Sequence, residues 1–221
     1  MIVAIDGPAG SGKSTIAKMV AVKLGITFMN TGSFYRGVTL GLLRSLGGSP
    51  DGSGARLPNL SNETQIIDFT RSVKLDYRNN HLFLDDEDVD CFLRGDAVEA
   101  IVAKVSAIVE VRHIVNDKIR EVAYNTGVVC EGRDMTTVVF PDTLNKFYLD
   151  ASVSARARRR FDQGTSKLNL PEIEASIIER DAIDRNKKEG SLKIAPDAIY
   201  LDTSDLTINQ VCDMIISKIH L

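Results

Sequence analysis

The stretch Gly7-Pro8-Ala9-Gly10-Ser11-Gly12-Lys13-Ser14 decides the fold of this chain of 221 residues. It matches the phosphate-binding loop pattern G-x-x-x-x-G-K-[ST] at every fixed position. The apolar run at residues 2–5 has the form of a buried parallel strand, and residues 16–24 place apolar side chains at helical spacing. Because strand, glycine-rich loop and helix is the order that the motif requires, the sequence predicts a nucleoside triphosphate site.

The residue types of this loop explain how it would bind an anion. Glycine has no β-carbon, so the backbone can turn tightly and approach a phosphate closely. Successive N–H groups of the loop and of the helix start then form a cradle in which the helix dipole favours negative charge. Lys13 is expected to reach the outer phosphates, and the Ser14 hydroxyl is expected to bind Mg2+.

Composition and charge limit the classes of function. A hydrophobic content of 43% supports a folded core, and a net charge of −3 argues against binding to a nucleic acid polymer. We see no run of membrane-spanning length and no signal peptide, so we expect a cytoplasmic protein without a membrane partner. The three cysteines are widely spaced and odd in number, which does not suggest a disulfide framework.

Four further strands are expected in the core, at residues 26–29, 128–130, 147–149 and 199–201. Polar residues follow two of them, at Asn30–Arg36 and Glu131–Asp134. Ligands of open α/β sheets bind at such carboxyl ends, and one acid of the second group could serve the metal. The alternatives are a helix cap with a core Tyr35 at the first place and a polar turn at the second.

The middle of the chain reads as an insertion. Residues 73–84 have the alternation of a hairpin with a turn at Asn79-Asn80, and Val89, Cys91 and Leu93 suggest a third strand. Residues 47–60 are expected to form an exposed loop, and Ser61 to cap a short helix. Apolar spacing predicts one long helix from residue 96 to about residue 124, on which Arg112 reads as a solvated side chain.

A basic helix is predicted over residues 154–160. Arg156, Arg159 and Arg160 share one face of it, residues 163–166 break it, and Pro171 restarts a helix. Two helices joined by a polar hinge describe a lid whose guanidinium groups stabilise a transferring phosphoryl group. The alternative is a solvated basic helix. On the second helix Arg180, Asp184 and Lys187 share a face, which by itself reads as a surface salt-bridge row.

Taken together, these segments resemble the bacterial cytidylate kinases, a family of nucleoside monophosphate kinases. The resemblance runs nearly end to end. It is carried by residues 5–15, 31–36, 132–135 with 137–141, Arg156-Ala157 with Arg159-Arg160, 179–181 with 184–186, and 197–198 with 201–204.

The resemblance implies an α/β P-loop NTPase fold of three layers. It implies a five-stranded parallel sheet, a small antiparallel β insertion in the region that binds the nucleoside monophosphate, and a helical lid. We expect a single kinase domain over residues 1–221. Its core comprises 1–29, 125–154 and 195–221, its monophosphate-binding region 30–124, and its lid 155–190.

The resemblance also implies the reaction, in which the γ-phosphoryl group of ATP passes to CMP, and to dCMP, with Mg2+. The partners are then small nucleotides, and we expect a monomer. The ATP-binding residues would be Gly7, Pro8, Ala9, Gly10, Ser11, Gly12, Lys13, Ser14 and Thr15, with Ser14 on the metal. The catalytic cations would be Lys13, Arg156, Arg159 and Arg160.

The acceptor residues are also implied by the resemblance. Thr31, Arg112 and Asp134 would face cytosine, Arg36 and Arg133 would hold the acceptor phosphate, and Tyr35 would line the site. Arg180 and Asp184 would meet the ribose, with Lys187 beside them. Asp134 is chemically suited to cytosine, because a carboxylate accepts a hydrogen bond from its exocyclic amine.

Five positions depart from the family pattern, which leaves substrate preference open. They are Asn30 for an aspartate, Ala103 for a serine, Thr136 for a glycine, and Ile183 and Lys187 for arginines. Two other functions remain as alternatives. A nucleotide-switched binding protein would hydrolyse slowly without an acceptor, and the arginine-rich lid argues against it. A kinase of another small molecule, such as shikimate, is disfavoured by the insertion.

Overall fold

The computed structural model describes residues 1–56, 62–164 and 168–220. The chain forms two compact units, which are described one by one. The first unit comprises Met1–Phe28 and Gly127–Leu221, and the second comprises Met29–Thr126. The division into core, monophosphate-binding region and lid stays a prediction. In the part of the chain that the structure describes, no helix combines the length and the apolar character needed to cross a bilayer.

The predicted five-stranded parallel sheet is confirmed. Its order is β2-β6-β1-β7-β8, and β1 pairs in parallel with β6 and β7 on its two sides. The strands are β1 (Ile2–Asp6), β2 (Thr27–Asn30), β6 (Val128–Gly132), β7 (Asn145–Asp150) and β8 (Ile199–Asp202). The phosphate-binding loop therefore leaves the central strand of the sheet at its carboxyl end.

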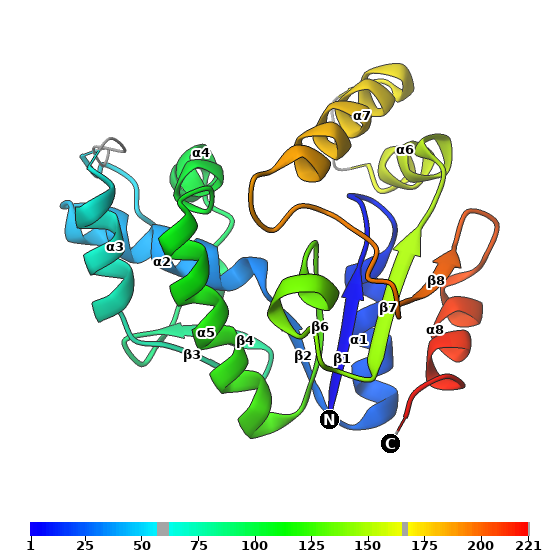
Figure 1. Cartoon of the computed structure of the whole chain (residues 1–221). Helices are drawn as coiled ribbons and strands as arrows, with labels where there is room; N and C mark the ends of the chain where they lie inside the picture. Colours follow the sequence, from blue (N-terminus) through cyan, green and yellow to red (C-terminus); the bar gives the residue numbers. More distant parts are fainter. Residues whose placement is uncertain (57–61, 165–167, 221) are drawn as a thin grey trace. The chain divides into compact units, whose positions relative to one another are not determined.

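Two helices of the first unit pack on the sheet (Figure 1). The apolar faces of α1 (Lys13–Leu24) and α8 (Ile208–Ile216) share one buried cluster with alternate residues of β1, β6, β7 and β8. The predicted C-terminal glycine of α1 is confirmed, since Gly25 has a φ of 66°. The predicted capping box of α8 is confirmed, with Gln210 and Thr207 bonding each other's backbone N–H.

Helices α6 (Val153–Asp162) and α7 (Leu170–Asn186) pack against each other (Figure 1). Ala157 of α6 and Ile173 and Ile177 of α7 form their buried contact. The N-caps are Ser152 and Asn169, as expected for short polar side chains at helix starts. Of the hinge predicted at residues 163–166, positions 165 and 166 lie outside the described residues.

The second unit contains helices and a small sheet. The helices are α2 (Gly32–Ser45), α3 (Glu63–Ser72), α4 (Asp96–Val105) and α5 (Val109–Thr126). The antiparallel strands are β3 (Leu75–Arg78), β4 (His81–Leu84) and β5 (Glu87–Asp88), in the order β3-β4-β5. The predicted hairpin turn is confirmed, with φ values of 55° at Asn79 and 63° at Asn80.

Two predicted elements of this unit are wrong. The third strand is Glu87–Asp88, and Val89–Leu93 instead enters a 3-10 turn over Asp90–Phe92. Val89 and Leu93, on either side of that turn, are both buried, so their spacing in the sequence resembles the alternation of a strand. The predicted long helix is two helices, since the helical conformation is interrupted between Val105 and Val109. Ile108 in the interruption is buried, so the apolar pattern of the sequence continues across it.

The segment between α2 and α3 needs two smaller corrections. Residues 47–56 of the predicted exposed loop are described, and Gly52 among them is buried beside Leu40 and Leu43. Residues 57–60 and the predicted cap Ser61 lie outside the described residues. The side chain that caps α3 is Asn62, which accepts a hydrogen bond from the Gln65 backbone N–H.

Candidate active site

Main-chain carbonyl groups of the phosphate-binding loop accept hydrogen bonds from side chains elsewhere in the first unit. Lys13 Nζ donates to the Pro8 carbonyl at 2.8 Å, and the Arg156 guanidinium donates to the Ala9 carbonyl at 3.1 Å. The Thr203 hydroxyl lies 3.4 Å from the Ser11 carbonyl. These contacts use carbonyl oxygens of the loop and none of its N–H groups, which an anion cradle requires as donors.

The loop conformation requires its glycines. Gly10 and Gly12 have φ values of 79° and 90°, in the left-handed region that side chains other than glycine rarely adopt. At Gly7 an added β-carbon would lie 2.0 Å from the Leu149 carbonyl oxygen. Any other residue at Gly7 would therefore push the loop away from the end of β7.

The inner side of the loop offers unsatisfied donors. Helix α1 starts at Lys13 behind a glycine cap, so no side chain caps the N–H groups of its first turn. The buried Ser11 hydroxyl has no hydrogen-bond partner among the described residues. A bound phosphate would satisfy the N–H groups of the first turn, and the helix start would favour its charge.

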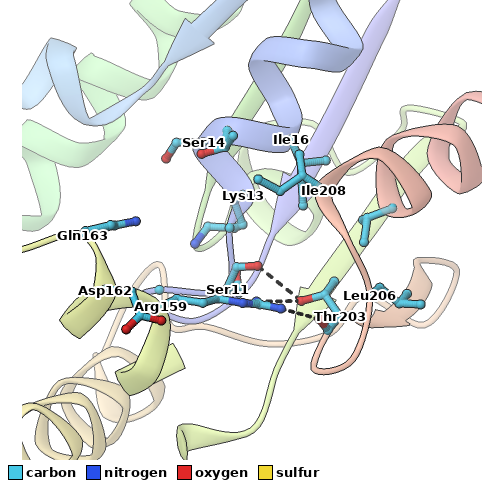
Figure 2. A pocket seen from close by; sticks show the side chains of 14 residues that line it. Ser11, Lys13, Ser14, Ile16, Arg159, Asp162, Gln163, Thr203, Leu206 and Ile208 are labelled. Carbon is cyan, nitrogen blue, oxygen red and sulfur yellow. Dashed lines mark hydrogen bonds between the residues drawn. The ribbon is translucent and has the colours of Figure 1, made fainter. Parts of the chain in front are cut away.

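A cavity of about 530 Å³ opens beside the loop (Figure 2). The loop and the start of α1 form one wall, and Arg159, Asp162 and Gln163 at the end of α6 form another. The remaining wall is mostly apolar and comes from residues 203–211, with Leu206, Ile208 and Val211. Arg159 donates to the Thr203 hydroxyl at 3.2 Å, so it is held at the cavity's edge. Arg160 follows on the same helix and is half-buried.

The ammonium group of Lys13 is in an unusual environment for a lysine. Lys13 is 5% exposed. Its burial lowers its pKa to about 7, and the positive charge of Arg133 contributes to this shift. Both Lys13 and Arg133 are predicted to bind phosphates, and the charge of Arg133 disfavours the charged form of Lys13. Anionic phosphate groups would remove this repulsion and favour the charged lysine.

The Ser14 hydroxyl donates to Glu131 Oε1 at 2.9 Å. A hydroxyl and a carboxylate are oxygen ligands of the kind that Mg2+ prefers, so these residues fit the predicted metal. Within the described ranges, no group of three His, Cys, Asp or Glu side chains forms a separate metal site. A Mg2+ ion bound by Ser14 and Glu131 would complete its coordination with water and nucleotide phosphates, as is usual for that ion.

Asp6 at the end of β1 was not singled out by the sequence. Its buried carboxylate accepts hydrogen bonds from the backbone N–H groups of Met135 and Thr136 and from the Thr136 hydroxyl, at 3.0, 2.7 and 2.7 Å. Burial raises its pKa to about 6, although these bonds act in the opposite direction. The carboxylate thereby fixes a π-helical turn, Met135–Val139, which starts directly after the predicted base-binding residue Asp134.

Three predicted acceptor residues lie together in the first unit. Asp184 is buried and binds Arg133 Nε at 2.8 Å and Lys187 Nζ at 2.7 Å. Burial raises the pKa of Asp184, but these hydrogen bonds outweigh it and hold the pKa below its usual value. Asp134 is buried as well, whereas Arg180 is exposed on α7. The sequence suggested a row of surface salt bridges here, but the carboxylate in the middle of that row, Asp184, is buried.

The remaining predicted acceptor residues lie in the second unit. The Tyr35 hydroxyl donates to Asn116 Oδ1 at 3.0 Å, and the Arg112 guanidinium lies over the Tyr35 ring, 5.5 Å from its centre. Arg36 donates to the Leu93 carbonyl at 3.0 Å and forms an ion pair with Glu99 at 2.8 Å. The sequence alternative of a simply solvated Arg112 is therefore wrong. Thr31 is buried at the start of α2.

The chain matches a known protein family over nearly its whole length. The family model described as "Cytidylate kinase" matches residues 3–221. The chain belongs to the cytidylate kinase family.

Curated cytidylate kinases are similar over their whole length. The cytidylate kinase of Thermodesulfovibrio yellowstonii is 38% identical over 221 residues, covering 99% of this chain and 97% of that protein. Cytidylate kinase 1 of Borrelia garinii is 41% identical over 223 residues, covering 100% and 97%. Among solved structures, an uncharacterized protein from Eubacterium ventriosum matches 98% of this chain and 96% of its own with a TM-score of 0.51. At 13% identity it shows the fold alone.

Several residues of the site have little distinctive signal in the sequence. Thr203 and Asp181 contact the loop or its partners, but a threonine after a strand and an acid on a charged helix carry no distinctive pattern. Asp6 precedes Gly7, and a polar residue at the end of a buried strand is the feature of the sequence that could have indicated its role. Arg156, predicted as a catalytic cation, is buried in an ion pair with Asp181.

Proposed function

We propose that this chain transfers the γ-phosphoryl group of ATP to CMP and to dCMP, giving CDP or dCDP and ADP. Membership of the cytidylate kinase family supports the reaction. The observation that carries it is the hydrogen bond of 2.9 Å from Ser14 Oγ to Glu131 Oε1, which holds the end of β6, with Arg133 just beyond it, beside the phosphate-binding loop. One cation for the donor phosphates and one for the acceptor phosphate then meet beside the same loop.

On the donor side, we infer that the N–H groups of residues 7–15 and Lys13 hold the ATP phosphates. Ser14 and Glu131 would hold Mg2+, which would neutralise charge on the phosphates. Arg159 and Arg160 at the end of α6 would stabilise the transferring group. The apolar wall of Leu206, Ile208 and Val211 suits a flat, weakly polar ring such as the donor base.

On the acceptor side, Asp134 would accept a hydrogen bond from the cytosine amine, with Thr31 and Arg112 on the same base. Arg36 and Arg133 would bind the acceptor phosphate, whose own oxygen attacks the γ-phosphorus. Phosphoryl transfer depends on positioning and charge stabilisation, so no protein nucleophile is needed. The other residues proposed for CMP are Tyr35 at the edge of the site, Arg180 and Asp184 at the ribose, and Lys187.

The test is acceptor specificity. ADP release is measured in a coupled assay with CMP, dCMP, UMP and AMP at equal concentrations, with Mg2+ and ATP. We expect turnover with CMP and dCMP and much less with the other two. Equal turnover with UMP or AMP would remove the assignment of cytosine to Asp134. Slow hydrolysis that no acceptor accelerates would instead favour a nucleotide switch.

We also propose that the enzyme is a cytoplasmic monomer that acts on free nucleotides. The net charge of −3 supports the absence of a nucleic acid polymer as partner. Light scattering of the purified chain with and without ATP tests the oligomeric state. A dimer mass under either condition would contradict the proposal.

A further inference from the structure

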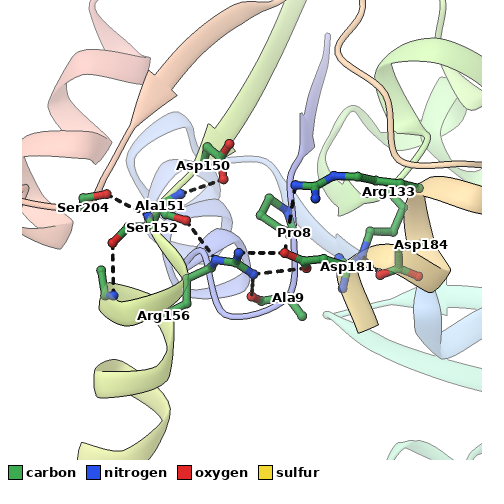
Figure 3. Close-up of polar contacts among 12 residues, drawn as sticks. Pro8, Ala9, Arg133, Asp150, Ala151, Ser152, Arg156, Asp181, Asp184 and Ser204 are labelled. Carbon is green, nitrogen blue, oxygen red and sulfur yellow. Dashed lines mark hydrogen bonds and ion pairs between the residues drawn. The ribbon is translucent and has the colours of Figure 1, made fainter. Parts of the chain in front are cut away.

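The guanidinium group of Arg156 is almost completely enclosed by protein. Arg156 is 2% exposed and is one of the largest fully buried side chains among the described residues. It forms a two-point ion pair with Asp181, at 3.1 and 2.7 Å, and donates from Nε to the Ala151 carbonyl at 2.9 Å. Figure 3 shows these contacts converging from the loop, the end of β7 and α7.

One contact of Arg156 reaches the phosphate-binding loop directly. Its Nη1 donates to the Ala9 carbonyl at 3.1 Å. Its stem packs beneath the next residue, since a β-carbon added at Gly10 would lie 3.3 Å from Arg156 Cβ. Arg156 does not line the cavity next to the loop, whereas Arg159 does. The side chain therefore touches the outer surface of the loop and not the space where phosphates would bind.

The partner of Arg156 lies on a helix face that also serves the acceptor side. Asp181 and Asp184 are both buried and stand three residues apart, so they project from the same side of α7. Asp181 binds Arg156, and Asp184 binds Arg133 (Figure 3). One face of α7 thus fixes both an arginine under the donor loop and an arginine proposed for the acceptor phosphate.

We propose that Arg156 is a positioning residue, held by Asp181, that sets the phosphate-binding loop through the Ala9 carbonyl. It does not contact the transferring phosphoryl group. This inference rests on the proposed function for the effect on turnover, but its effect on ATP binding can be measured without any acceptor.

Stability and positioning have to be separated in the test. Removing one partner of a buried ion pair leaves a charge without compensation and destabilises the fold strongly. Replacing both partners by apolar side chains of similar size is often neutral for stability. The informative variant is therefore the pair Arg156→Met with Asp181→Leu, and Arg156→Lys serves as a second variant that keeps the charge balance but loses the two-point contact.

Three quantities are measured for each variant: the free energy of unfolding in urea, the Kd for ATP with Mg2+ in the absence of acceptor, and the KM for CMP. For the paired variant we expect unchanged stability and a Kd for ATP raised about tenfold, the equivalent of one charge-assisted hydrogen bond. The KM for CMP should stay within about twofold, since Arg133 keeps Asp184. Arg156→Lys should raise the Kd for ATP in the same direction.

Asp181→Asn distinguishes positioning from direct contact. If Arg156 positions the loop, this variant also raises the Kd for ATP, although Asp181 lies behind the arginine. Two exposed positions provide matched controls: Arg158→Lys on α6 for Arg156→Lys, and Glu179→Gln on α7 for Asp181→Asn. Both control variants should bind ATP normally.

Two outcomes would overturn the proposal. The first is a paired variant with the wild-type Kd for ATP, which would make the ion pair a matter of stability alone. The second is Asp181→Asn with full activity while Arg156→Lys loses turnover at an unchanged Kd, as expected of an arginine that acts on the phosphoryl group. Failure of the proposed function would look different, because the wild type itself would then not phosphorylate CMP.

Discussion

At the scale of single residues, burial decides what each charged side chain can do. Arg156, Arg159 and Arg160 lie on one short helix, yet the first is enclosed by protein and the second borders the cavity. A sequence shows three arginines at suitable spacing and cannot rank them, because the difference arises from Asp181 on another helix. Asp6 is a similar case, since its enclosure depends on a turn that starts at Met135.

The pKa of Asp6 gives a prediction for pH. Its value of about 6 in the folded chain lies above the ordinary 3.8, so the folded state binds the proton more tightly than the unfolded chain. This group's contribution to stability is fully present below pH 3.8 and is lost as the pH rises through 6. The shift corresponds to about 3 kcal/mol.

The measurement is the carboxyl carbon resonance of Asp6, followed by NMR from acid to neutral pH. We expect a midpoint close to 6. Thr136→Val removes one hydrogen bond to the carboxylate and should move the midpoint upward. A midpoint near that of an exposed aspartate would show that the carboxylate is hydrated, contrary to the geometry.

Glu99 gives a second prediction at this scale. Its carboxylate pairs with Arg36, the residue proposed for the acceptor phosphate, so CMP would have to displace it. The side chain of Glu99 is half exposed, and such pairs are weak. We therefore expect Glu99→Gln to lower the KM for CMP by roughly twofold to fivefold.

Glu121→Gln removes the same charge at an exposed place on α5 and provides the control for Glu99. Steady-state kinetics at low and high salt would check the effect, which should shrink as salt screens the pair. A KM for CMP that rises in Glu99→Gln would mean that Glu99 orients Arg36 and does not compete with the substrate.

At the scale of elements, the sequence predicts best where the apolar pattern and its boundary agree. The five strands are short apolar runs with polar residues or glycine at their ends, and all five were found. The break after Val105 could not be seen, because Ile108 continues the stripe through the turn. The 3-10 turn at Asp90–Phe92 was read as a strand because Val89 and Leu93 are buried at a spacing that fits both.

Helix α2 and the β hairpin are in close contact through a glycine. A β-carbon added at Gly37 would lie 2.3 Å from Leu82 Cδ2 and 3.2 Å from Leu75 Cδ2. Alanine is a better helix former than glycine, but overpacking a core typically costs about 1–3 kcal/mol. We therefore expect Gly37→Ala to lower the free energy of unfolding, as measured in urea.

The control for Gly37 is a double-mutant cycle with Leu82→Ala, which makes room for the added methyl group. The combined loss should be smaller than the sum of the single losses. Additive losses would show that the two residues do not press against each other.

At the scale of the whole molecule, ligand binding should stabilise the fold by mass action. ATP with Mg2+ at about 100 times its Kd should add about 3 kcal/mol to the free energy of unfolding of the unit that holds the loop. The change is measured as a rise in the thermal midpoint. Lys13→Met should abolish most of it, whereas Lys18→Met, exposed on the same helix, should not.

Metal removal belongs to the same experiment. A chelator should stop turnover and reduce the thermal shift, and added Mg2+ should restore both. Full activity in excess chelator would contradict the role given to Ser14 and Glu131.

The hydrogen bonds to carbonyl groups of the phosphate-binding loop have a consequence for sequence variation among related chains. The carbonyl oxygens of Pro8, Ala9 and Ser11 accept hydrogen bonds from side chains. The donors are Lys13, Arg156 and Thr203, in that order. Every amino acid has a carbonyl oxygen in its main chain. The half-buried side chain of Ala9 can therefore change without loss of this hydrogen bond, whereas Gly7, Lys13, Arg156 and Thr203 cannot be replaced so easily. Related chains should therefore vary more at position 9 than at positions 13, 156 and 203.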